Sequence, residues 1–64
     1  MKITRRIAEN CVSYLQEKGY SAYVHEHNNI IKVSIVIDNM DLELSADEIV
    51  NRNELFLEES LETE

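Results

Sequence analysis

Two dipeptides, Asn28-Asn29 and Asp38-Asn39, divide the middle of the chain into short segments that can pair with one another. Asn and Asp tolerate the left-handed backbone that a two-residue hairpin turn requires. Such a turn also fixes which residues face each other across the strands, so each turn predicts a register that the apolar pattern can test. The middle of the chain is therefore predicted to form hairpins.

The register that follows from the first turn separates apolar residues from polar ones. It places Val24 opposite Val33 and Ala22 opposite Ile35, and both pairs are apolar. The interleaved pairs are largely polar, and a slip by one residue would lose this separation. These pairs are His27 with Ile30, His25 with Lys32, Tyr23 with Ser34 and Ser21 with Val36.

The second turn passes the same test. It sets Ile37 opposite Met40 and Ile35 opposite Leu42, so a third strand extends the apolar face. The acidic residues between these apolar ones then point to the opposite face, because side chains alternate along a strand. Together the two turns predict a three-stranded antiparallel meander.

A helical pattern precedes the meander. Apolar residues recur there every four positions, which places them on one face of a helix. These residues are Ile3, Ile7, Cys11 and Leu15. Gly19 follows and can adopt the positive φ that ends a helix. We predict a helix over about residues 3–18.

A second helix follows the meander. Ser45 and Glu48 have the spacing of a capping box, so this helix should begin at Ala46. Polar residues then interrupt its apolar stripe, and Asn53 can cap a new helix, so we expect a kink or break near Asn53. Acidic residues crowd the negative end of the helix dipole, so about residues 60–64 should fray.

The order of these elements predicts an α+β fold. It is helix, three-stranded antiparallel meander, helix (αβββα), and we expect a two-layer sandwich with both helices on the apolar face of the sheet. Residues 1–64 should form a single small domain, because a second core would need roughly 50 more residues. Double-stranded-RNA-binding domains resemble the chain in element order only. Their last helix starts with basic residues, whereas Asp47 and Glu48 are acidic here.

Charge sets the class of partner. The chain carries 13 acidic and six basic residues, for a net charge of -7, which argues against direct binding of nucleic acid or of an anionic membrane. A larger protein with a basic surface remains a suitable partner. The acidic residues that could form this interface are Asp38, Asp41, Glu43, Asp47, Glu48, Glu54, Glu58 and Glu59. The alternative is that they only keep a small domain soluble.

No pattern of catalytic or cofactor-binding residues occurs, so we expect neither enzyme activity nor a cofactor. His25 and His27 share a strand face but lack a third metal ligand at suitable spacing, so no metal site is expected. Cys11 is expected to be a small buried hydrophobe. A lone cysteine and the lack of a long apolar stretch predict a cytoplasmic location, which is the host cytoplasm if a phage encodes the chain.

Two functions are compatible with this pattern. The leading hypothesis is a non-catalytic inhibitor that occupies the basic, nucleic-acid-binding surface of a larger protein. In size and charge the chain resembles phage and mobile-element antagonists such as anti-CRISPR proteins. The alternative is a small regulatory or assembly subunit, or a homodimer, that acts through the open sheet face or an edge strand. The residues of that face are Tyr23, His25, Ile30, Lys32 and Val36.

Overall fold

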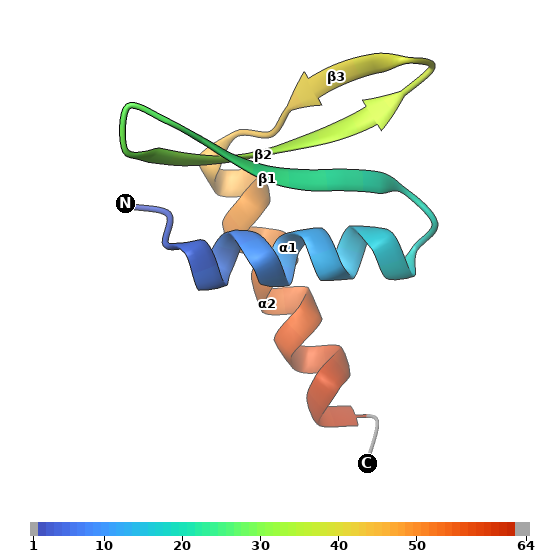
Figure 1. Cartoon of the computed structure of the whole chain (residues 1–64). Helices are drawn as coiled ribbons and strands as arrows, with labels where there is room; N and C mark the ends of the chain where they lie inside the picture. The colour runs from blue at the N-terminus through green and yellow to red at the C-terminus, as the bar shows by residue number, and fades with distance from the viewer. Residues whose placement is uncertain (1, 63–64) are drawn as a thin grey trace.

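The structure is a computed structural model that describes residues 2–62 of the 64-residue chain. It has the predicted αβββα order, an α+β fold with one open antiparallel sheet in the strand order β1-β2-β3 (Figure 1). The elements are α1 (Arg5–Glu17), β1 (Ser21–His27), β2 (Ile30–Ile37), β3 (Met40–Glu43) and α2 (Ala46–Glu62).

Both turns of the sheet adopt the left-handed backbone that the sequence predicts. In Asn28-Asn29 and in Asp38-Asn39, the first residue has a φ of 53° and the second a φ of 65°. Positive φ at both positions defines a type I′ turn, whose twist matches that of the flanking strands. Both predicted registers are confirmed, since Ala22 faces Ile35 and Ile35 in turn faces Leu42.

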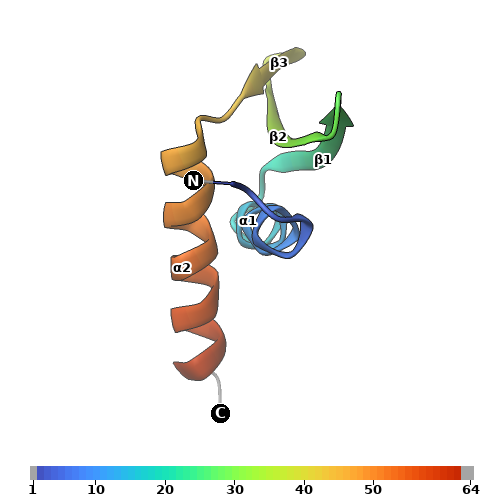
Figure 2. The same ribbon diagram turned by 90° about the vertical axis from the view of Figure 1, so that its left-hand side faces the viewer.

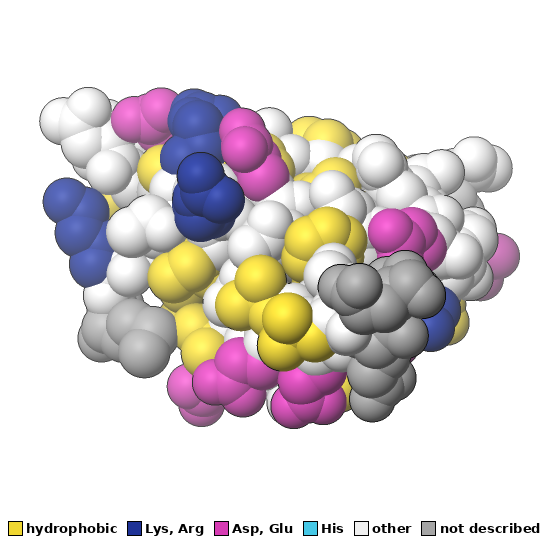
Figure 3. All heavy atoms as spheres, turned by 90° about the horizontal axis from the view of Figure 1, so that it is seen from below, with side chains coloured by type: hydrophobic (Ala, Val, Ile, Leu, Met, Phe, Trp, Pro, Cys, Tyr) yellow, Lys and Arg dark blue, Asp and Glu magenta, His cyan; other side chains and the backbone are white. Residues whose placement is uncertain are grey.

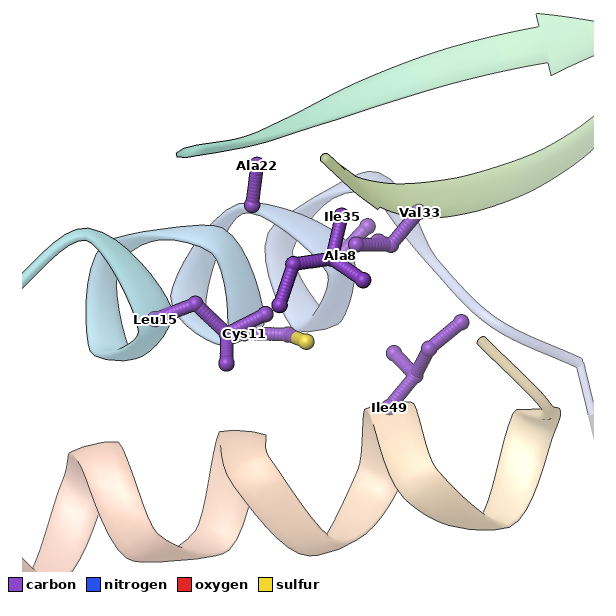
Figure 4. Packing of buried hydrophobic residues seen from close by; sticks show 7 residues of the cluster. All are labelled: Ala8, Cys11, Leu15, Ala22, Val33, Ile35 and Ile49. Carbon is purple, nitrogen blue, oxygen red and sulfur yellow. The ribbon is translucent and has the colours of Figure 1, made fainter. Parts of the chain in front are cut away.

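The core is small and lies mainly between α1 and the sheet (Figure 4). Val33, at the centre of the middle strand, has no exposed surface. Ala8 and Cys11 of α1 are equally inaccessible, and their small side chains let the helix approach the sheet closely. The buried hydrophobic residues are Ala8, Cys11, Leu15, Ala22, Val33, Ile35 and Ile49. Among the residues that the structure describes, Ile49 is the only member of this set from α2.

The second helix packs mainly against α1, which differs from the predicted packing of both helices on the sheet (Figure 2). Asn10 of α1 donates a hydrogen bond to Asn53 Oδ1 at 2.8 Å, and Lys18 forms a 3.2 Å ion pair with Glu59. Because α1 already covers β1 and β2, the remaining apolar surface that α2 meets is the flank of α1. The part of the apolar sheet face that β3 contributes is left uncovered.

No break interrupts α2, so the prediction of a kink or break near Asn53 is wrong. The side chain of Asn53 accepts a hydrogen bond from α1 and is therefore not used to cap a new helix. Arg52 donates to the carbonyl of Glu48 one turn earlier and so also stays within the helix. Of the residues predicted to fray, 60–62 form the last turn of α2, and 63 and 64 lie outside the described residues.

The capping box at the start of α2 is confirmed. The amide of Ser45 donates to Glu48 Oε1 at 2.9 Å, and the amide of Glu48 donates to Ser45 Oγ at 3.3 Å. The hydrogen bond from the Ser45 amide, and then the contact with its side chain, lower the pKa of the Glu48 carboxyl. At α1, Thr4 Oγ1 accepts from the amide of Ile7, so this helix begins at Arg5, two residues later than predicted.

Replacement of Val33 tests the core. Val33→Asp places an unpaired carboxylate where no surface is exposed, which should cost several kcal/mol, close to the whole stability of so small a domain. We expect loss of the cooperative transition in thermal unfolding followed by circular dichroism. Ile30→Asp is the matched control at a 57% exposed position, and it should melt within a few degrees of the parent, since surface substitutions change stability by about 0.5 kcal/mol. A Val33→Asp variant that melts like the parent would show that Val33 is not buried in the core.

Replacement of Ser45 tests the helix cap. Ser45→Ala removes the oxygen that accepts from the amide of Glu48, while the reciprocal bond to the Glu48 carboxylate stays possible. The free energy of unfolding should fall by about 1 kcal/mol in urea denaturation. An unchanged midpoint would mean that the hydroxyl does not cap α2 in solution.

Candidate functional site

The eight acidic residues predicted as an interface do not form one continuous surface. Asp38, Asp41 and Glu43 lie at the second turn and on β3, on the sheet side of the molecule. Asp47, Glu54 and Glu58 lie along α2, which runs away from the sheet (Figures 1 and 2). At 1.5 Å per residue, Asp47 and Glu58 are about 16 Å apart along the helix axis. The structure therefore offers two acidic surfaces.

The sheet group is partly neutralised within the molecule. Asp41 Oδ2 accepts a hydrogen bond from the hydroxyl of Tyr23 at 3.1 Å. Glu43 forms an ion pair with Lys32 at 3.3 Å. Both carboxylates remain exposed, so each can still meet a further cation.

The helix group forms what we term the acidic ridge: Asp47, Glu54 and Glu58. Separations of seven and four residues place all three on one face of α2, and all three are exposed. Within residues 2–62, none of these three carboxylates has a salt bridge or a hydrogen bond. Glu54 and Glu58, four residues apart, also repel each other weakly. In the view from below, a row of acidic side chains follows the lower edge, separated by a band of hydrophobic side chains from a group of Lys and Arg (Figure 3).

The other two predicted acidic residues have structural partners. Glu48 belongs to the capping box of α2. Glu59 pairs with Lys18 across the two helices at 3.2 Å, and this hydrogen-bonded contact raises the pKa of the lysine. Their carboxylates are therefore less available to a partner than those of the acidic ridge.

The alternative interface predicted on the sheet is brought together on one face. Tyr23, His25, Ile30, Lys32 and Val36 all lie on the side of the sheet away from α1, because they alternate with the core residues of their strands. The rings of Tyr23 and His25 are 5.5 Å apart, and His25 Nε2 lies 2.9 Å from Ser34 Oγ.

Sequence reasoning did not single out Ser34, although the predicted register already placed it at the centre of this face. Its neighbours bury it to 4% exposure, and its hydroxyl is the hydrogen-bonding partner of His25. Together with the Tyr23 to Asp41 and Lys32 to Glu43 contacts, this makes the face a network of polar groups that satisfy one another.

The described side chains show no arrangement typical of a metal centre. Within residues 2–62, no three His, Cys, Asp or Glu side chains gather closely enough to hold a metal ion. Cys11 is buried, as predicted. Burial, partly opposed by the nearby Arg52, raises the pKa of its thiol to about 11. The thiol is therefore protonated and a poor nucleophile at neutral pH.

The chain matches no protein-family model, no curated protein and no solved structure in the three comparisons. These comparisons therefore assign neither a family nor a function. Neither of the helices described in residues 2–62 is long and apolar enough to cross a membrane.

The raised pKa of Cys11 predicts a specific dependence of stability on pH. The folded state favours the neutral thiol. The contribution of this thiol to stability is therefore complete below its pKa in the unfolded chain, near 9, and is lost as pH rises towards about 11. Over that range the free energy of unfolding should fall by up to about 1.4 kcal/mol per pH unit from this group. The Cys11→Ala variant lacks the thiol. The difference in free energy of unfolding between the parent and this variant, measured by urea denaturation, should therefore narrow as pH rises from about 9 to about 11. A constant difference would show that the thiol ionises normally.

Proposed function

We propose that this chain is a non-catalytic protein-binding domain that inhibits a larger protein by occupying its basic, nucleic-acid-binding surface. The observation that carries the proposal is the acidic ridge, whose three exposed carboxylates have no cation among the described residues. The acids beside Lys18 and Lys32, in contrast, are paired within the molecule. Charge left uncompensated in the folded chain is available to a partner.

The shape of the ridge suits a basic groove. Seventeen residues of α2 extend over about 25 Å, and the helix projects beyond the sheet rather than lying flat on it (Figure 1). A net charge of -7 on a 64-residue chain also steers association with a basic surface and disfavours association with phosphates. A groove lined by Lys and Arg that normally receives nucleic acid is therefore the kind of partner we propose.

A second candidate is a regulatory or assembly subunit that acts through the sheet face. One observation favours it, since the five residues of that face lie together and no described element covers them. Their polar groups already have hydrogen-bond or ion-pair partners elsewhere on the same face, however, so this face has less unsatisfied chemistry to offer than the acidic ridge.

Charge reversal on α2 tests the proposal. Glu54→Lys with Glu58→Lys should abolish capture of partners from a nuclease-treated lysate of the source cells by the immobilised chain. The matched control is Glu9→Lys with Glu17→Lys, which changes the net charge by the same amount on exposed positions of α1 and should retain capture. Captured proteins should be nucleic-acid-binding proteins that double-stranded DNA displaces. Capture should also weaken between about 0.1 and 1 M salt, as the Debye length falls from about 10 to 3 Å.

Two results would contradict the proposal. Equal loss of capture by the two double variants would indicate a response to net charge rather than to the acidic ridge. Capture that persists in high salt and survives the reversal on α2 would instead favour the sheet face as the interface. Circular dichroism confirms folding, and the reversal should not lower stability, because it removes no described contact.

A further inference from the structure

The third strand is the least covered element of the sheet. Its apolar side chains, Met40 and Leu42, are 57% and 43% exposed on the face that α1 covers elsewhere. Neither helix packs substantially on β3, because α1 lies under β1 and β2 and α2 lies beside α1 (Figure 2). The part of the apolar sheet face that β3 contributes is therefore open beside α2.

A groove continues from this uncovered face. It has a volume of about 340 Å³ and lies between the strands and the first turns of α2. Apolar side chains form most of its wall, and Glu48 and Arg52 border it on the helix. The apolar wall includes Leu15, Tyr20, Ile37, Leu42 and Leu44. The groove can receive apolar side chains that approach beside β3.

The main chain of β3 is also open along its outer edge. Residues that flank a two-residue turn exchange hydrogen bonds, and hydrogen-bonded pairs then alternate along the hairpin. Met40 and Leu42 therefore bond to β2, as the amide of Leu44 does to Val33 at 2.9 Å. The amides and carbonyls of Asp41 and Glu43 point away from β2, and no described strand pairs with them.

The opposite edge of the sheet is protected in ways that β3 is not. Gln16 of α1 donates a hydrogen bond to the carbonyl of Ala22, which the same alternation places on the outer edge of β1. Glu26 lies on the inner face of β1 and is held by Arg5 at 3.2 Å, and an inward charge of this kind discourages further strand pairing. Of the two edges of the described sheet, the edge at β3 is the one that combines open main-chain groups with an open apolar face.

We infer that β3 accepts an additional strand from a partner protein. That strand has alternating basic and apolar residues. Its main chain bonds to Asp41 and Glu43, its apolar side chains cover Met40 and Leu42 and enter the groove, and its cations meet the two carboxylates on the other face. The inference rests on the proposed function in expecting a basic partner, but it assigns that partner a surface separate from the acidic ridge.

Charge favours such a partner over a second copy of this chain. Two β3 strands paired antiparallel about a twofold axis place side chains of the same face opposite each other. In the register centred on Leu42, which pairs the two β3 strands along most of their length, Asp41 of each copy faces Glu43 of the other, and like charges directly opposite are destabilising. A basic strand replaces this repulsion with attraction at both positions.

A synthetic heptapeptide tests strand addition to the full chain. The probe alternates Lys and Val with blocked ends, and a peptide of the same composition with its Lys and Val in two blocks is the control. The alternating peptide should bind about tenfold or more tightly, because only it presents apolar and basic residues on opposite faces. Its binding should slow amide hydrogen exchange at Asp41 and Glu43, measured by NMR.

Two variants separate main-chain pairing from charge. Asp41→Pro removes the outward amide, and Asp41→Ala does not, although both lose the carboxylate and its bond from Tyr23. The alternating peptide should bind the Pro variant about tenfold more weakly than the Ala variant. If the Pro variant does not fold, amide hydrogen exchange in the unmodified chain still reports whether the peptide pairs with the main chain of β3.

The outcomes distinguish this inference from the proposed function. Equal binding of both peptides, lost on Glu54→Lys with Glu58→Lys, overturns strand addition and leaves the acidic ridge as the binding surface. Selective binding of the alternating peptide that survives the reversal on α2 supports strand addition even if the acidic ridge has no role. Strand addition is also overturned if neither peptide binds, or if the alternating peptide binds without slowing amide hydrogen exchange at Asp41 and Glu43.

Discussion

The packing of α1 against Val33 is the interaction on which the rest of the structure depends. Ala8 and Cys11 present so little volume that the helix lies close to the middle strand and seals it from water. Once α1 occupies that position it covers β1 and β2, so among the described residues of α2 only Ile49 is buried in the core. The bare face of β3 and the projecting acidic helix are both consequences of this arrangement.

Local chemistry made much of the fold predictable. Turn residues at two positions fixed the register of every strand pair, and Ser45 with Glu48 fixed the start of α2. The continuity of α2 was not predictable in this way, because the residue that looked like a new cap, Asn53, has its partner 43 positions earlier in α1. Tertiary contacts of this kind leave no trace in local periodicity, which is also why the packing of α2 beside α1 was missed.

The candidate site was predictable in composition but not in arrangement. Sequence identified eight acidic residues. In the structure four of them have partners within the molecule, namely Asp41, Glu43, Glu48 and Glu59, while Asp38 and the three residues of the acidic ridge have none among the described residues. The difference depends on where Lys18 and Lys32 lie in space, which sequence spacing does not reveal. The contrast between the two sheet edges likewise depends on a tertiary contact, the hydrogen bond that Gln16 donates to the carbonyl of Ala22 on β1.

The exposure of β3 in the isolated chain is the most direct test of this account. NMR relaxation of side-chain methyl groups by a soluble paramagnetic agent measures how closely solvent approaches each one. The methyl groups of Met40 and Leu42 should relax strongly, as should those of Leu61 near the end of α2, while those of Val33 and Ile35 should stay protected. Protection of Met40 and Leu42 equal to that of Val33 would show that another part of the chain, or a second copy, covers this face, and would contradict the account.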